Sequence, residues 1–284
     1  MRLKFSAEDI ERWRDRTYRR TARFAITNEK QALAFINSVG FCLASKADGL
    51  ELPNLWEALV GRKNSHDARS DRSYYLSYAW DIHYILPNHN SVYYGKLFRR
   101  RPTLVSREYF PYFYALAKRT GAKDEYLTEF SQGNLSALAK HLMDILVRRS
   151  PLTTKELRTI LATESKKHVD GLDRALDELQ RNMYICRLVG STQRFGAAWA
   201  PVLKMFGKEV RKARKISVED ARCKLLEKYF RNQLITSVET IHKVLGWSRK
   251  DIYHTLGQLI RNGIITPCTA FDGEKGKWYC IIRA

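Results

Sequence analysis

Apolar residues recur at helical spacing near the end of the chain, and a β-hairpin pattern follows them. Three helices are predicted, over residues 221–231, 238–245 and 248–262. A hairpin is predicted over residues 264–282, directly after Gly263, a residue type that ends many helices. Helix, helix, helix and hairpin in this order is the pattern of the winged helix-turn-helix.

The same order of elements occurs once before in the chain. The sequence LQRNMYI at residues 179–185 is repeated as LIRNGII at residues 259–265. In the earlier copy an apolar stripe predicts a first helix, Thr153 or Thr154 is the expected N-cap of a second, and a third helix ends in the repeated sequence. The two winged helices predicted from this repeat span residues 129–203 and 217–284.

A basic helical arm is predicted over residues 1–27. Its arginines recur at the spacing of one helix face. They are Arg12, Arg16, Arg19 and Arg23. Such a face either contacts phosphates or is only solvated, and both alternatives stay open.

Residues 28–128 are predicted to form a degenerate winged-helix-like domain. Asn28 is the expected N-cap of a helix over Glu29–Val39, and a short helix is expected over Leu55–Val60. Aromatic residues are dense between residues 74 and 98, where they either line a nucleobase pocket or fill a core. The predicted fold class is mainly α with small β-hairpins, an α+β arrangement of three tandem winged helix-turn-helix units.

The chain is strongly basic. Among its 284 residues, 50 are Lys or Arg and 30 are Asp or Glu, which gives a formal net charge of +20. This balance indicates a polyanionic partner, and with winged helices it predicts double-stranded DNA. A basic connector is predicted over residues 204–216, where Glu209 is the only acid. A second basic cluster contains Lys96, Arg99, Arg100, Arg101 and Arg107.

The predicted DNA contacts lie on the third helices of the units, on hairpin turns and in the basic clusters. The third helix of a winged helix enters the major groove, where Arg reads base edges and Lys more often contacts phosphates. The predicted contacts are Arg62, Lys63, Lys96, Arg99, Arg100, Arg101, Lys166, Lys167, Arg174, Arg194, Lys212, Arg214, Arg249, Lys250, Tyr253, His254 and Lys275.

Known catalytic and metal-binding motifs are absent from the sequence, including phosphate-binding loops, HExxH and GxSxG. The five cysteines are scattered and are expected to be reduced core thiols. His66, His83 and His89 lie near acidic residues, but no metal and no cofactor is expected. With no apolar run of about 18 residues, no membrane partner is expected either. The expected location is cytoplasmic, with the nucleoid when bound to DNA.

The chain resembles the winged-helix DNA glycosylases of the AlkZ/YcaQ type, as a divergent member. The resemblance rests on residues 135–200 and on ISVEDAR at residues 216–222. It implies tandem winged helices and a DNA-binding architecture. The family's catalytic signature, Gln-x-Gln or Gln-x-Asp, follows the first N-terminal helix. Here that region reads VGFCLAS at residues 39–45, so Phe41 and Leu43 take the place of the catalytic pair. The resemblance therefore carries over DNA binding and not base excision.

Four functions stay open on the sequence alone. The first is a DNA-binding protein associated with DNA repair. The second is an active DNA glycosylase that excises alkylated or cross-linked bases, with a relocated carboxylate as the base that activates water; the candidates are Glu51, Glu57 and Asp81. The third is a transcription regulator, and the fourth is a protein-interaction module built on winged helices.

Overall fold

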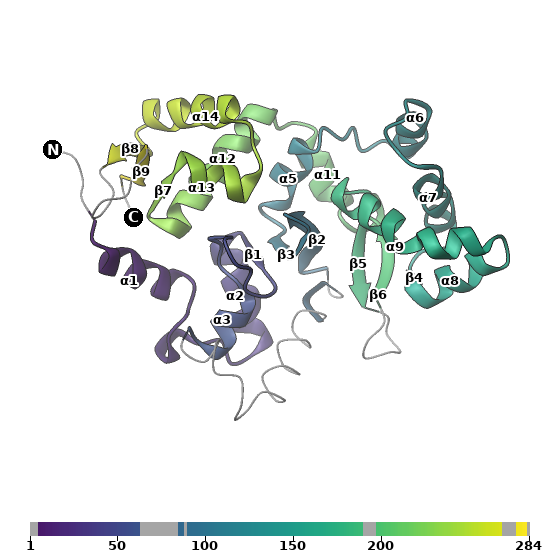
Figure 1. Ribbon diagram of the computed structural model, residues 1–284, viewed down its shortest axis with the longest axis horizontal. Helices are drawn as coiled ribbons and strands as arrows, with labels where there is room; N and C mark the ends of the chain where they lie inside the picture. Colours follow the sequence, from purple (N-terminus) through teal and green to yellow (C-terminus); the bar gives the residue numbers. More distant parts are fainter. Residues whose placement is uncertain (1–4, 63–84, 88–89, 190–196, 269–276, 283–284) are drawn as a thin grey trace.

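The structure is a computed structural model that describes residues 5–62, 85–87, 90–189, 197–268 and 277–282. Helices dominate these residues, and three small antiparallel sheets accompany them (Figure 1). The fold is therefore α+β and mainly helical, as the sequence predicts. Within the described ranges, no helix is long and apolar enough to cross a membrane.

The three sheets share one strand order, in which the last strand in sequence lies between the other two. The first sheet contains β1 (Phe41–Leu43), β2 (Val92–Phe98) and β3 (Arg101–Ser106). The second contains β4 (Leu152–Thr153), β5 (Ile185–Val189) and β6 (Ala197–Pro201). The third contains β7 (Ile235–Ser237), β8 (Ile265–Cys268) and β9 (Trp278–Ile281). A topology that occurs three times indicates one structural plan used repeatedly along the chain.

Three helices accompany each of the last two sheets, in the predicted order. In the middle unit they are α7 (Ala137–Arg149), α8 (Thr154–Ala162) and α9 (Lys166–Arg181). In the C-terminal unit they are α12 (Val218–Gln233), α13 (Val238–Leu245) and α14 (Arg249–Arg261). In each unit one strand lies between the first and second helices, and the hairpin follows the third.

The first unit has the same arrangement as far as the structure describes it. It contains α2 (Glu29–Val39), β1, α3 (Leu55–Val60), β2 and β3, and both helices have the predicted bounds. The Asn28 side chain accepts a hydrogen bond from the backbone N–H of Gln31 at 2.9 Å, which confirms the expected N-cap. Gly40 ends α2 with a φ of +77°, and a Cβ there would lie 2.8 Å from the ring of Tyr109.

Local capping signals fix helix ends in the other two units as well. Thr153, and not Thr154, is the N-cap of α8, because its hydroxyl accepts from the backbone N–H of Glu156 while the Glu156 carboxylate accepts from the backbone N–H of Thr153. Gly263 follows α14 with a φ of +65°, as predicted. These signals act over a few residues, so the sequence alone reveals them.

The predicted single helix face of the N-terminal arm is wrong. Helix α1 (Ala7–Thr17) ends at Tyr18, whose side chain is buried, and the chain turns into the short 3₁₀ helix η1 (Ala22–Phe24). Arg19 has a φ of +56°, outside the conformation of a right-handed helix. Arg23 lies on η1, so the four arginines do not share one helix.

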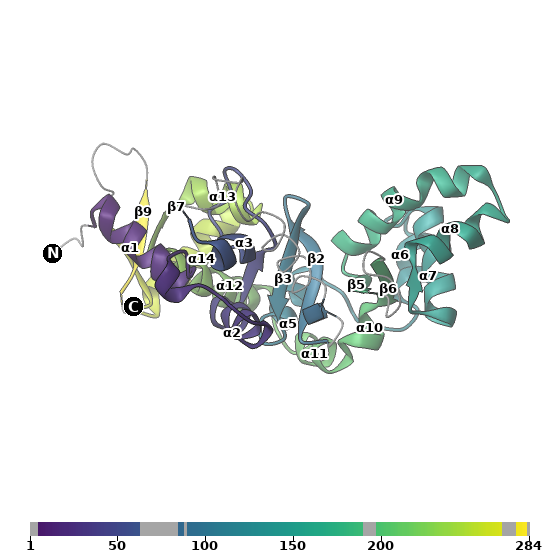
Figure 2. The same cartoon turned by 90° about the horizontal axis from the view of Figure 1, so that it is seen from below.

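The segment predicted as a basic connector is helical and packed. It contains the second half of α10 (Val202–Met205) and all of α11 (Gly207–Ala213). Val210 and Ala213 are buried in the same core as Phe110 on α5 (Phe110–Leu116), because they face inward while the basic residues of α11 face solvent. In Figure 2, α11 lies on the side of the molecule opposite α9.

Three cores hold the units together. The largest joins the first sheet, α5 and α11 to the C-terminal unit, and Phe41, Phe110 and Tyr229 belong to it. The middle unit has a core of its own around Leu142, which also takes in Tyr126 of α6 (Glu125–Ser131). The third lies among α2, α3 and the first sheet. The first unit consequently lies between the middle unit and the C-terminal unit (Figures 1 and 2).

Candidate nucleic-acid interface

A basic groove of about 710 Å³ opens between α1, η1 and α2, and we call it the arginine groove. Its basic lining is Arg16, Arg19 and Arg23, and its aromatic lining is Trp13 and Phe24. The guanidinium of Arg23 lies 5.6 Å from the ring centroid of Phe24. Three of the four arginines that the sequence placed on one helix face thus converge on one groove, through a turn of the chain.

The arginines of the groove differ in pairing from their neighbours in sequence. Within the described ranges, Arg16, Arg19 and Arg23 form no ion pair. The other described arginines of this segment are neutralised: Arg12 pairs with Asp9 at 2.7 Å, Arg14 with Glu51 at 2.8 Å, and Arg20 with Asp15 at 2.9 Å. The positive charge that the segment presents to solvent is therefore concentrated in the groove.

The turn between β2 and β3 carries a second group of arginines. Arg99 and Arg100 are the two central residues of this hairpin, with φ of +44° and +61°, and Arg101 opens β3. All three are exposed. Residues with a Cβ pay about 1–2 kcal/mol each in this conformation, which is why Asn and Gly are preferred at such turns. The fold by itself gives no reason for arginine there.

Two basic residues of this hairpin contact the middle unit. Asp177 on α9 lies 3.1 Å from Lys96 Nζ, 3.7 Å from Arg100 Nε and 3.1 Å from Arg181 Nε. Three cations thus surround one carboxylate, so the junction of the two units keeps a positive charge. Lys96 and Arg100 help to hold the units together, and their contact with DNA stays a prediction.

The third helices of the two later units present basic and aromatic side chains to solvent. On α9, Lys166 and Arg174 are exposed. On α14, Lys250 and His254 are exposed, and Tyr253 is 42 % exposed. A third helix is the element that enters the major groove in a winged helix, so this exposure is what base or phosphate contact requires.

Three side chains around α14 interact with one another or with neighbouring helices. Arg249 Nη1 lies 3.3 Å from Glu239 on α13, in an exposed ion pair. Lys277 Nζ lies 5.3 Å from the ring centroid of Tyr253. Lys277 is not one of the contacts that the sequence predicts, and its place beside Tyr253 is a tertiary contact that the sequence does not reveal.

Other predicted contacts have partners within the protein. Arg62 forms ion pairs with Glu11 and Asp15 of α1. Arg214 donates to the backbone carbonyls of Thr120 at 2.6 Å and Gly121 at 2.7 Å. Lys212 is exposed on α11. The predicted contacts are therefore spread over several faces, and Arg62 and Arg214 hold segments of the chain together.

Several predicted residues lie outside the described residues. They are Lys63, Asp81, Arg194 and Lys275, together with His66, His83 and His89. Lys167 lies in α9, but its side chain is not described.

The two residues that the family resemblance puts in the place of the catalytic pair lie in a closed apolar core. Phe41 and Leu43 on β1 are 0 % and 1 % exposed. The ring of Phe41 lies with its centroid 5.5 Å from that of Phe98 and 5.3 Å from that of Phe113. The side chains of Phe41, Phe98 and Phe113 offer a water molecule no hydrogen-bond partner.

Glu57 on α3 lies beside a polar pocket of about 310 Å³. Its side chain is buried, and both carboxylate oxygens have partners: Oε1 lies 3.2 Å from Lys46 Nζ, and Oε2 accepts from Asn54 Nδ2 at 2.9 Å. Gln233 of α12 also lines this pocket. The carboxylate is held in place, and a cation and an amide stand next to it.

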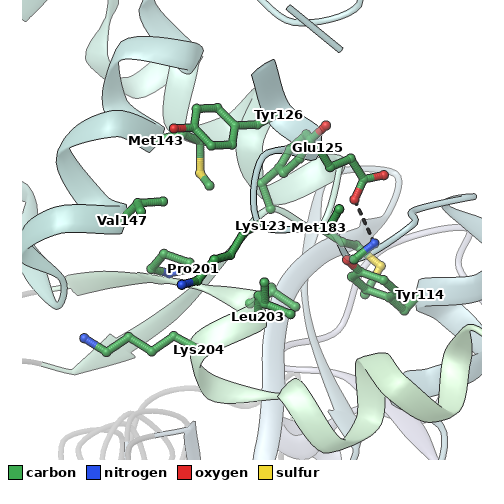
Figure 3. Close-up of a pocket in the computed structure, with 14 residues that line it drawn as sticks. Tyr114, Lys123, Glu125, Tyr126, Met143, Val147, Met183, Pro201, Leu203 and Lys204 are labelled. Atoms are coloured by element: carbon green, nitrogen blue, oxygen red, sulfur yellow. Dashed lines mark hydrogen bonds between the residues drawn. The ribbon is translucent and has the colours of Figure 1, made fainter. Parts of the chain in front are cut away.

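A second pocket, of about 290 Å³, lies between the middle unit and α10 (Figure 3). Met143, Val147, Tyr184 and Leu203 give it an apolar wall. Glu125 also lines it, but its oxygens accept from the backbone N–H groups of Thr120 at 2.7 Å and Gly121 at 2.9 Å. The pocket offers apolar surface, and its carboxylate is already bound to the backbone.

Comparison with known proteins gives a family match for the sequence and a match for the fold. A family model described as "AlkZ related" matches residues 26–246. The structure is similar to that of the Streptomyces sahachiroi DNA glycosylase AlkZ, with a TM-score of 0.60 and 15% sequence identity, over 99% of this chain and 71% of that chain. At this identity the likeness shows a shared fold. No curated protein matches the sequence.

Proposed function

The chain belongs to the AlkZ-related family, and on that premise we propose that it binds double-stranded DNA through tandem winged helices, in association with DNA repair. The observation that carries the proposal is the arginine groove, where Arg16, Arg19 and Arg23 have no acidic partner among the described residues. Unpaired guanidinium groups in a groove are ready donors for phosphate oxygens. Cellular DNA in the cytoplasm would be the partner.

In this proposal each of the three units of the protein is a winged helix. The first spans residues 28–128, the middle one 129–203 and the C-terminal one 217–284, with the arm over residues 1–27 and the segment over residues 204–216 beside them. In the middle and C-terminal units, α9 and α14 would enter the groove. The hairpin that follows each helix would be its wing.

The β2–β3 turn supports the same proposal. Arg99 and Arg100 occupy a backbone conformation that favours glycine or asparagine. The conformational free energy that such residues cost often accompanies a functional site. Three consecutive arginines point in different directions. They are therefore better suited to contact phosphates along a curved DNA backbone than to contact the bases of one step. These residues would position the duplex and not select its sequence.

The burial of Phe41 and Leu43 supports a function of binding without base excision. Excision requires a group that orients water and stabilises a cationic sugar, and neither side chain has a lone pair. The protein would therefore hold DNA, or mark a lesion, while another activity cleaves the base.

A second candidate function is an active DNA glycosylase with a relocated carboxylate, for which Glu57 and Asp81 are candidates. One observation favours it: Glu57 lies beside a polar pocket next to Lys46 and Asn54, as a water-activating base would. The similar structure is that of a DNA glycosylase, AlkZ, so this fold has a precedent for base excision.

Binding is tested by fluorescence anisotropy with a labelled duplex at several salt concentrations. The variant Arg16→Gln/Arg19→Gln/Arg23→Gln should bind more weakly, and the slope of log K against log salt should fall by about 0.9 for each phosphate that the variant no longer neutralises. Arg12→Gln is the matched control, because Arg12 is exposed but paired with Asp9. If the triple variant binds as the wild type does, or the wild type fails to bind at low salt, the proposal is wrong.

Excision is tested separately, on duplex DNA that contains alkylated bases. Alkaline cleavage reports abasic sites, and none above background is expected from the wild type. If sites accumulate over many turnovers and Glu57→Gln abolishes them, the glycosylase function replaces the first proposal.

A further inference from the structure

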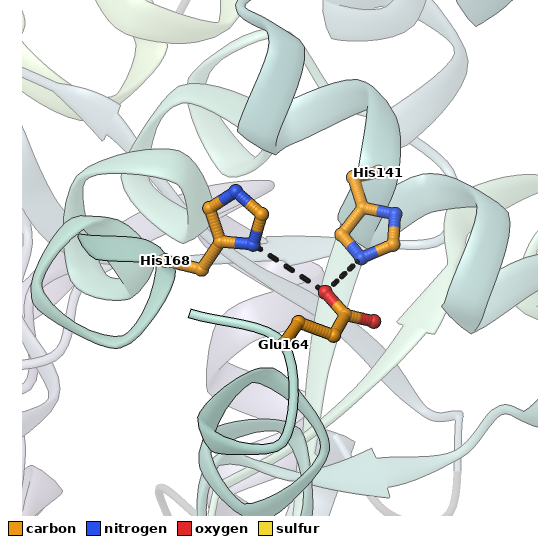
Figure 4. Close-up of side chains that lie close together, drawn as sticks. All are labelled: His141, Glu164 and His168. Carbon is orange, nitrogen blue, oxygen red and sulfur yellow. Dashed lines mark hydrogen bonds and ion pairs between the residues drawn. The ribbon is translucent and has the colours of Figure 1, made fainter. Parts of the chain in front are cut away.

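We propose that His141, Glu164 and His168 form a binding site for a divalent transition-metal ion, with Zn²⁺ as the expected ion. One ligand atom from each residue lies within 4.8 Å of the others (Figure 4). His141 Nε2 is 2.7 Å from Glu164 Oε2, and His168 Nδ1 is 3.4 Å from the same oxygen. The site lies in the middle unit and uses none of the residues of the proposed DNA contacts.

Three elements position these side chains. His141 lies on α7, Glu164 lies in the short turn between α8 and α9, and His168 lies on the first turn of α9. The backbone N–H of Glu164 donates to Leu161 at 3.0 Å, and that of His168 donates to Ser165 at 3.1 Å, so hydrogen bonds hold both backbones. Glu164 and His168 are four residues apart, a spacing that places two side chains on one side of a helical turn.

The donor set selects among metal ions. Two imidazole nitrogens and one carboxylate suit Zn²⁺, Co²⁺ and Ni²⁺, whereas Mg²⁺ and Ca²⁺ prefer oxygen ligands alone. Three ligand atoms lie within 4.8 Å of one another, and each side chain keeps between 36% and 42% of its surface exposed. That exposure leaves room for water at the fourth position.

The distances also suit a metal ion. With metal–ligand distances of about 2.0 Å, neighbouring ligand atoms of a tetrahedral site lie about 3.3 Å apart. The distance from His168 to Glu164 already has this value within about 0.1 Å. The shorter one, from His141 to Glu164, is a hydrogen bond, and the ion would replace its proton and widen the gap by about half an ångström.

A bound ion would link the first helix of the middle unit to the start of the third. His141 on α7 and His168 on α9 lie with their ring centroids 5.8 Å apart, and coordination would fix that separation. The metal would therefore stabilise the folded middle unit and hold the N-terminal turn of α9. This inference stands whether or not α9 contacts DNA.

Isothermal titration of the full chain with ZnCl₂, after removal of any affinity tag, tests the proposal. One equivalent of Zn²⁺ should bind with a dissociation constant tighter than about 10 µM. His141→Ala and His168→Ala should each weaken binding by about tenfold or more. The control is His242→Ala, which removes an exposed histidine from α13 and should leave the titration unchanged.

Two further readouts separate coordination from simple loss of structure. Co²⁺ in place of Zn²⁺ should give visible absorption bands that are absent from Glu164→Gln, a variant that keeps the size of the side chain and removes its negative charge. Saturating Zn²⁺ should raise the melting temperature of the wild type by about 5 °C and leave that of His141→Ala unchanged. Absence of Zn²⁺ binding, or binding that all three variants retain, overturns the proposal.

Discussion

Arg107 and Glu209 form an ion pair in which Arg107 Nη2 lies 2.9 Å from Glu209 Oε1, although 102 positions separate them in sequence. Arg107 follows β3, and Glu209 lies on α11 with a buried side chain. Arg107 also donates to the backbone carbonyl of Asn90 at 2.9 Å. The acid of the basic connector thus neutralises a residue of the other basic cluster and attaches α11 to the first unit.

Arg107→Ala should destabilise the protein by about 1–3 kcal/mol, because it leaves the buried carboxylate of Glu209 without its cation. Urea unfolding followed by circular dichroism measures the change. In the Arg107→Ala background, Glu209→Gln should restore part of the loss, since it removes the buried charge. Arg211→Ala, an exposed change on the same helix, is the control and should alter the free energy of unfolding by less than about 0.5 kcal/mol. Equal effects of Arg107→Ala and Arg211→Ala would contradict the role of the pair.

Replacement of Arg99, Arg100 and Arg101 with Ala should weaken binding to unrelated duplexes about equally. The three side chains lie at a hairpin turn and would contact phosphates, which carry no sequence information. Anisotropy titrations with several duplexes of different sequence measure this. A loss confined to one sequence would show that the turn reads bases.

The stabilising effect of Asp177 should disappear in acid. Partial burial raises the pKa of this carboxyl, but the hydrogen bond from Lys96 and the charges of Lys96, Arg181 and Arg100 outweigh it, so the pKa in the folded protein lies below the ordinary value of 3.8. The folded state therefore gains stability from the ionised form. That gain is complete above the unfolded pKa and is lost as the pH falls below 3.8 through the lower folded pKa.

Asp177→Asn isolates this contribution. Wild type should be more stable than the variant at about pH 6, and the difference should shrink at about pH 3, measured by urea unfolding at both values. Asp173→Asn on the same helix is the control, because Asp173 is 83% exposed and its ion pair with Arg158 is long, at 3.9 Å. A difference that stays constant with pH would show that the ionised carboxylate does not stabilise the junction.

Phe41→Gln should destabilise the protein by about 3–5 kcal/mol and should not create base excision. The variant removes a ring from a closed core and places a polar amide among the rings of Phe98, Tyr109 and Phe113. Thermal unfolding measures the first effect and alkaline cleavage of alkylated duplex DNA the second. A folded variant that released bases would show that this position is accessible after all.

The sequence by itself determined several helix ends and the order of elements in the middle and C-terminal units. Asn28, Thr153 and Gly263 act on backbone groups within a few residues of themselves, so the ends that they cap follow from local chemistry. The apolar spacing of α9 and α14 and the repeated sequence at their ends established the repeat for the same reason. Family resemblance followed from these local patterns.

The tertiary structure alone decided which charged side chains form ion pairs within the described residues and which do not. Arg16, Arg19 and Arg23 meet in one groove because the chain turns after Tyr18, and helical periodicity cannot express a turn of that kind. Lys96 and Asp177 find each other across two units, as do Arg107 and Glu209.

The metal-ligand set shows the same limit. His141 and Glu164 lie 23 positions apart in sequence and 2.7 Å apart in space, because α7 packs against α9. Charges and ligand atoms interact through space over a few ångströms, whatever the length of chain between them. The pattern of apolar residues in the sequence therefore predicts the helices that carry these groups. Only the packing of those helices decides which groups come into contact.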